Sequence, residues 1–114
     1  MNDGKNQDLF WMKLTIDFFY DDRIEYLMEE EGELKGSMIV LIYELLCLET
    51  LNTNGYLVSV INGTVRPMDE AEITKAIRFF SEENVRSSLK KLKEVGLIST
   101  EENDWMRMEG RELL

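Results

Sequence analysis

The 114 residues provide enough chain for one domain, and a content of 44% hydrophobic and 32% charged residues is typical of a globular protein. A single cysteine and the absence of histidine exclude an intrachain disulfide, cysteine–histidine zinc sites and histidine-dependent nucleophiles. No apolar run reaches the ~18 residues of a membrane span. The polar start MNDGKNQD lacks the apolar core of a secretory signal, so we expect a cytoplasmic protein.

The first predicted element is a short strand. Residues 1–9 are expected to form a flexible tail, and residues 10–16 alternate between two faces and are rich in aromatic and β-branched types, which is typical of a strand. Asp21 or Asp22 is then in position to cap a helix that Gly32 interrupts.

The next predicted element is a central, buried helix. Ser37 is expected to cap a helix that extends to about Leu51 and is apolar around nearly its whole circumference, a pattern that indicates burial on all sides. Cys47 lies within this helix, where a buried structural thiol is expected rather than a reactive one. Asn54 and Gly55 indicate a turn.

After this turn we predict a strand over residues 56–60 and a loop over residues 62–67. Asp69 and Glu72 fit a capping box that opens a helix running to about Phe80.

The last predicted helix begins immediately afterwards. Ser81 is expected to cap it, Val85, Leu89 and Leu92 form its inward stripe, and Gly96 ends it in a left-handed conformation.

The end of the chain is predicted to form a hairpin. The segments LIST (97–100) and WMRM (105–108) read as two strands joined by the polar turn EEND. Residues 109–114 are expected to be a tail, or the start of a linker to a further C-terminal region.

This order of elements is a helix-turn-helix followed by a two-stranded hairpin, which is the winged-helix arrangement. The predicted fold is therefore α+β and mostly helical: a winged helix-turn-helix domain over residues 10–108, with a small antiparallel wing and an N-terminal strand. The second helix of the pair is the candidate recognition helix.

The charge distribution points to the same helix. The net charge is −10, but residues 74–93 contain six basic and only two acidic side chains, and local field decides where a phosphate backbone docks. Arg86, Lys90 and Lys93 recur at helical spacing on one face. The candidate DNA-binding residues are Lys75, Arg78, Asn84, Arg86, Ser87, Lys90, Lys91, Lys93 and Arg107.

Several features allow other interpretations. A basic stripe is often simply a solvated helix face, the wing tip carries acidic residues, and Glu82 and Glu83 occupy the helix start that would welcome a phosphate. The aromatic group near the N-terminus could stack on nucleic acid, although packing in a core or a dimer is the stronger interpretation. Its candidate oligomerisation residues are Phe10, Trp11, Phe18 and Phe19.

Two further site types find little support. The acidic run 29–33 lacks the ligand spacing of a calcium loop, and the sequence contains neither a glycine-rich phosphate loop nor a convincing pair of catalytic carboxylates. We expect no metal, no cofactor and no enzymatic activity.

Four segments resemble the N-terminal domain of phage replisome organisers, which are related to DnaD-like replication initiators. These are WMKLTIDFFYDDRI, the aliphatic helix IVLIYELLCLE closed by NTNGYL, RPMDEAEITKAI, and NVRSSLKKLKEVGLIS followed by WMRM. The first and last are the most specific, and the resemblance covers roughly residues 10–108.

The resemblance implies a winged helix, double-stranded origin DNA as the target, helicase-loading proteins as partners, and self-association. Three hypotheses follow: a replication initiator that binds DNA through residues 78–93, an oligomerisation module without direct DNA contact, and a phage transcriptional regulator with the same fold. The acidic surface favours the second, and any DNA affinity of the domain alone is expected to be weak and salt-dependent.

Overall fold

The computed structural model describes residues 21–101 and 104–110. The predicted tail 1–9, the predicted strand 10–16 and the four candidate oligomerisation residues lie outside these ranges. The chain in the described part forms four α-helices, a short 3-10 helix and two antiparallel hairpins, so the expected α+β, mostly helical class is confirmed.

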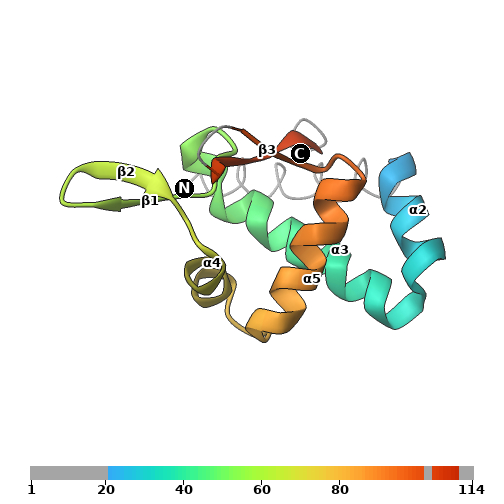
Figure 1. Cartoon of the computed structure of the whole chain (residues 1–114). Coiled ribbons are helices and arrows are strands. Elements are labelled where there is room, and N and C mark those ends of the chain that lie inside the picture. Colours follow the sequence, from blue (N-terminus) through green and yellow to red (C-terminus); the bar gives the residue numbers. More distant parts are fainter. Residues whose placement is uncertain (1–20, 102–103, 111–114) are drawn as a thin grey trace, which may run out of the picture.

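Helix α3 (Glu33–Glu49) runs through the centre of the molecule, with α2 (Asp22–Glu31), α4 (Glu70–Ile77) and α5 (Glu82–Glu94) around it (Figure 1). Its side chains of Ile39, Ile42 and Leu46 are fully buried, and Cys47 is buried as expected. Leu41 is 46% exposed, so the burial does not extend around the whole helix.

The predicted cap of this helix at Ser37 is wrong by five residues, because the observed N-cap is Gly32. Gly32 adopts a φ of 88°, which ends α2 and lets the chain reverse into α3 at Glu33 without an intervening loop. A Cβ added at Gly36 would lie 3.1 Å from the Met28 backbone, so this glycine lets α2 and α3 approach closely.

The capping predictions for α2, α4 and α5 are confirmed. The Asp21 carboxylate accepts the Arg23 amide at the start of α2, and Asp69 with Glu72 forms the reciprocal capping box of α4. The Ser81 hydroxyl accepts the Asn84 amide to start α5.

Helix α5 ends as predicted, since Gly96 has a φ of 82° and the Leu97 amide donates to the Leu92 carbonyl. Helix α4, however, ends at Ile77 and not near Phe80, because Arg78 and Phe79 both take positive φ values of 59° and 47°.

The predicted C-terminal hairpin is present. β3 (Ile98–Thr100) pairs antiparallel with β4 (Met106–Met108), and Ile98 faces Met108. Residues 55–57 add a third backbone segment beside β4, because the Leu57 amide donates to the Met106 carbonyl and the Met108 amide to the Gly55 carbonyl.

The predicted loop over residues 62–67 is wrong. β1 (Val58–Ile61) pairs with β2 (Thr64–Pro67) in a hairpin that projects away from the helices (Figure 1). Asn62 and Gly63 both have positive φ values, 51° and 79°, which form the tight two-residue turn that matches strand twist. The short 3-10 helix Leu51–Thr53 connects α3 to this region.

Candidate nucleic-acid interface

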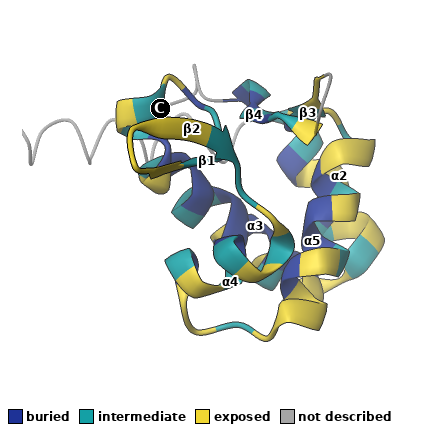
Figure 2. Ribbon diagram, turned by 60° about the vertical axis from the view of Figure 1, so that its left-hand side comes forward, coloured by how far each residue is buried: buried dark blue, intermediate teal, exposed yellow. Residues whose placement is uncertain are grey.

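Helix α5 is held by one apolar stripe, which decides the direction of its other side chains. Val85, Leu89 and Leu92 are at most 2% exposed and pack into the core formed with α3 and α4. Burying side chains of this size contributes about 1.5–3 kcal/mol each. Figure 2 shows the buried side of α5 turned toward α3 and its exposed residues on the outside.

Lys90 and Lys93 are both exposed, so these two basic residues point outward as predicted. At 100° per residue, Lys90 lies nearly opposite the buried stripe, and Lys93 lies at its margin. The outermost row of the helix also contains Glu83 and Glu94, both exposed, so the charge of this face is mixed.

Arg86, a predicted phosphate contact, is already bound by two carboxylates. Its Nε donates to Glu70 Oε1 at 2.8 Å, and its Nη2 lies 3.2 Å from Glu82 Oε2. The hydrogen bond that Arg86 donates to Glu70 raises the pKa of Arg86, and it fastens the start of α4 to α5. A phosphate would have to compete with both acids for this guanidinium.

Lys91 is also committed to the fold. Its Nζ lies 3.2 Å from Glu31 Oε2 and 3.5 Å from Glu94 Oε2, so it ties α5 to the end of α2. Glu31 accepts from Lys91 and from Lys35, and these contacts lower its pKa. Lys91 therefore has a structural partner that its position in the basic stripe did not reveal.

The end of α4 and the turn that follows it present the remaining cations. Lys75 in the last turn of α4 and Arg78 directly after it are exposed. Among described residues 21–101 and 104–110, no carboxylate lies within ion-pair distance of these two or of Lys90 and Lys93.

The two polar candidates lie on α5 itself. Asn84 is exposed, and the Ser87 hydroxyl donates to the Asn84 carbonyl at 3.1 Å. Asn84 thus offers its amide to solvent, whereas the Ser87 hydroxyl is turned toward its own helix backbone. The sequence predicted the correct helix for both residues but not the direction of their side chains.

Arg107 lies outside α5, on strand β4 of the C-terminal hairpin. Its guanidinium stacks over the Tyr56 ring at 5.8 Å and pairs with Glu109 at 3.0 Å. The Tyr56 hydroxyl donates to Glu101, which raises the pKa of Tyr56. Arg107 is not part of the α5 cluster, and its acidic neighbours Glu101 and Glu109 reduce its attraction for a phosphate.

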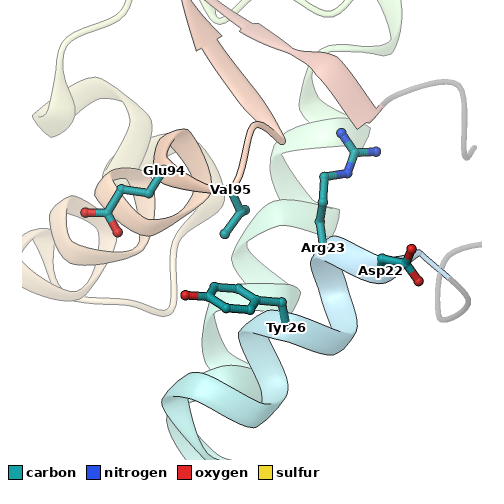
Figure 3. Close-up of a pocket in the computed structure, with 5 residues that line it drawn as sticks. All are labelled: Asp22, Arg23, Tyr26, Glu94 and Val95. Atoms are coloured by element: carbon teal, nitrogen blue, oxygen red, sulfur yellow. The ribbon is translucent and has the colours of Figure 1, made fainter.

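A separate open pocket of about 340 Å³ lies between the start of α2 and the end of α5. Figure 3 shows the Tyr26 ring pointing toward Val95, while the Glu94 carboxylate points away from Arg23. The Arg23 guanidinium is bound to Asp21 at 2.8 Å and to the Gly96 carbonyl at 3.3 Å, so it is occupied in joining α2 to the turn after α5.

Residues 21–101 and 104–110 contain no group of three or more histidine, cysteine or acidic residues arranged to hold a metal ion. Helices long and apolar enough to cross a membrane are likewise not found in this part of the chain.

The sequence did not reveal two features: the carboxylates that pair with Arg86 and Lys91, and the exposure of Phe79. The i, i+4 spacing of Glu82 and Arg86 was a usable signal for one ion pair. Glu70 and Glu31 reach α5 from other helices, and no local pattern indicates such partners. Phe79 is 86% exposed, in the turn where Arg78 and Phe79 both take positive φ values.

Comparison with known proteins agrees with the resemblance. The model of a family described as the N-terminal phage replisome organiser matches residues 11–112. Searches of curated proteins and of solved structures gave no significant match. Since the family match extends over nearly the whole chain, this protein belongs to the N-terminal phage replisome organiser family and has a function related to phage DNA replication.

Proposed function

We propose that this chain is a winged-helix domain that binds duplex DNA through α5 in the initiation of phage DNA replication. The order α4, α5, β3, β4, with residues 55–57 beside β4, supports the winged-helix assignment. The observation that carries the proposal is the buried stripe of α5, which turns Lys90 and Lys93 to solvent.

The candidate side chains fall into two groups, those without a carboxylate partner among the described residues and those already bound to one. Lys75, Arg78, Lys90 and Lys93 would contact phosphates, which fix position, and Asn84 would reach base edges. Four phosphate contacts correspond to a slope of log affinity against log salt of about −3.6. Arg86, Lys91 and Arg107 would contribute only after leaving their carboxylate partners.

A matched pair of charge reversals tests this proposal. Lys90→Glu should weaken binding to duplex DNA about tenfold or more and make the salt slope shallower by about 1 or more. Lys35→Glu makes the same charge change on α3, where it also breaks the ion pair with Glu31, and should lower affinity far less. Fluorescence anisotropy across a salt series measures both quantities, with circular dichroism to check folding. Equal affinities for the two variants would refute the proposal.

A second candidate is an interaction module that self-associates and recruits helicase-loading proteins without touching DNA. The acidic wing residues Glu101 and Asp104 and the mixed outer row of α5 favour it, since both repel a phosphate backbone. The role of Phe10, Trp11, Phe18 and Phe19 in self-association stays a prediction. Light scattering should then show an oligomer that Trp11→Ser dissociates.

Two other assignments belong to the proposal. Its role is binding and not catalysis, and phage DNA replication would place the domain in the cytoplasm. A phage transcriptional regulator would share the fold and differ in its target. Preference for an operator sequence over replication-origin DNA in the anisotropy assay would favour the regulator.

A further inference from the structure

The β1–β2 hairpin has one face made entirely of apolar side chains. Alternation along the two strands and the pairing of Val58 with Pro67 and Val60 with Val65 put these four residues on the same side. Val60 is 65% exposed and Val65 is 48% exposed. Two exposed β-branched side chains facing each other across a ribbon form a continuous apolar strip.

The opposite face already has a partner within the chain. Arg66 donates from both guanidinium nitrogens to Glu72, at 3.0 and 2.7 Å, and Glu72 belongs to the capping box of α4. These bonds attach the polar face of the hairpin to α4. The apolar face therefore points away from α4.

The apolar face borders an open groove of about 350 Å³. Its other walls are the aromatic rings of Tyr56 and Trp105, which meet edge to face with centroids 6.3 Å apart, together with Asn52 and Thr53. An apolar wall on one side and two aromatic rings on the other suit an extended segment with apolar side chains.

The outer edge of β1 is unpaired in the described part of the chain. In an antiparallel pair, the backbone groups of successive residues point alternately toward the partner strand and away from it. The Met68 amide donates to the Leu57 carbonyl, and the two-residue turn pairs Ile61 with Thr64. Val58 and Val60 therefore direct their backbone groups away from β2. Among the described residues β1 has β2 as its single strand neighbour. The outer edge of β2 is blunted instead, because Pro67 has no amide hydrogen.

The charge of the segment decides which partner can approach. Residues 54–67 carry one charged side chain, Arg66, in a protein of net charge −10 with 32% charged residues. Two copies repel each other over most of their surfaces, and this segment is where they can meet without bringing acids together. The same segment contains an extended strand with alternating valines, which is the kind of partner that the groove and the unpaired edge of β1 would accept.

We propose that the hairpin is a self-association surface, at which the β1 edge of one copy pairs antiparallel with the β1 edge of a second copy. The two ribbons then form one four-stranded sheet, in which both apolar faces lie on the same side and make one continuous apolar surface. A two-fold arrangement satisfies both edges at once. A two-stranded hairpin is marginally stable alone, so the added strands also stabilise each ribbon.

This inference rests on the self-association part of the proposed function and moves its site to residues 58–67. Val60→Pro removes an amide hydrogen that the ribbon itself does not use, and Val60→Lys puts a charge on the pairing edge. The matched control is Ile61→Lys, a β-branched residue 48% exposed on the other face, whose backbone groups point to β2.

The full chain is studied by sedimentation velocity over a concentration series, with circular dichroism to verify folding. We expect Val60→Pro and Val60→Lys to weaken dimerisation by about tenfold or more, because each blocks edge pairing. Ile61→Lys should dimerise like the unaltered chain. Duplex binding by a Val60 variant, measured as a monomer, should change far less than with Lys90→Glu.

Other outcomes overturn the inference in distinguishable ways. If Trp11→Ser abolishes association while both Val60 variants associate normally, the surface lies elsewhere and self-association itself stands. If the unaltered chain is monomeric at every concentration, self-association fails altogether. Capture of a different protein by a monomer, lost on Val60→Lys, would show that the groove serves a foreign strand and not a second copy.

Discussion

Arg78→Gly is predicted to stabilise the domain even though it deletes a candidate DNA contact. Arg78 ends α4 with φ 59° and ψ −157°, a region of backbone space that glycine alone adopts without strain. Its amide still closes the helix by donating to the Thr74 carbonyl, a bond that glycine keeps. Glycine is the usual residue just beyond a helix end for this reason.

The size of the gain follows from two opposing terms. Strain at a residue in this region costs about 1–3 kcal/mol, while glycine loses about 0.5–1 kcal/mol through the greater freedom of the unfolded chain. The side chain of Arg78 is exposed, so its removal subtracts little. We expect a net gain of about 1 kcal/mol in the free energy of unfolding, or roughly 4 °C in Tm.

The control is Arg78→Ala, which removes the same side chain and keeps the strain. Urea unfolding followed by circular dichroism should rank the glycine variant above both the alanine variant and the unaltered chain. Both variants should lose DNA affinity equally if the guanidinium contacts a phosphate. A glycine variant no more stable than the alanine variant would show that the backbone at Arg78 is unstrained.

Three further predictions concern the core and the ion pairs. Leu92→Ala should lower the free energy of unfolding by about 3 kcal/mol because the side chain is 0% exposed, whereas Leu34→Ala, at 88% exposure, should change it little in the same urea titration. The lowered pKa of Glu31 means that its ionised form adds stability above its ordinary value of 4.5, and this is lost as pH falls through its lower folded pKa. Glu31→Gln should therefore be less stable than the unaltered chain at neutral pH and equal to it at a pH well below 4.5, as unfolding at the two pH values would measure. Gly110→Ala should lower Tm, because a Cβ there would overlap the hydroxyl of Tyr43.

These predictions can each fail in a specific way. Equal losses for the two leucine variants would contradict the assigned burial of α5 against α3. A constant difference between Glu31→Gln and the unaltered chain at all pH values would show that Glu31 is not stabilised by its lysine partners. An unchanged Tm for Gly110→Ala would mean that the Tyr43 ring can move aside without loss of packing.

Local signals in the sequence predicted most helices and their ends. Asp21, Asp69 and Ser81 each cap the helix that they were expected to cap, and Gly96 ends α5 in a left-handed conformation. These features act over three or four residues, so their physics is contained in the local chain. The buried stripe of α5 was equally predictable, because helical spacing alone defines it.

Tertiary structure decided where charges and edges are available. Glu70 and Glu31 reach Arg86 and Lys91 from other helices, so the basic stripe of α5 contains fewer free cations than its spacing suggested. The strand Thr64–Pro67 was missed because its alternation is short and its role depends on pairing with β1.

By itself, then, the sequence determined the family, the capped helices and the outward direction of Lys90, because each depends on residue types at fixed local spacing. The partners of Arg86 and Lys91, the exposure of Phe79 and the apolar hairpin face were decided by the tertiary structure alone. The physical reason is that ion pairing and burial depend on distances between segments far apart in the chain, which local propensities do not encode.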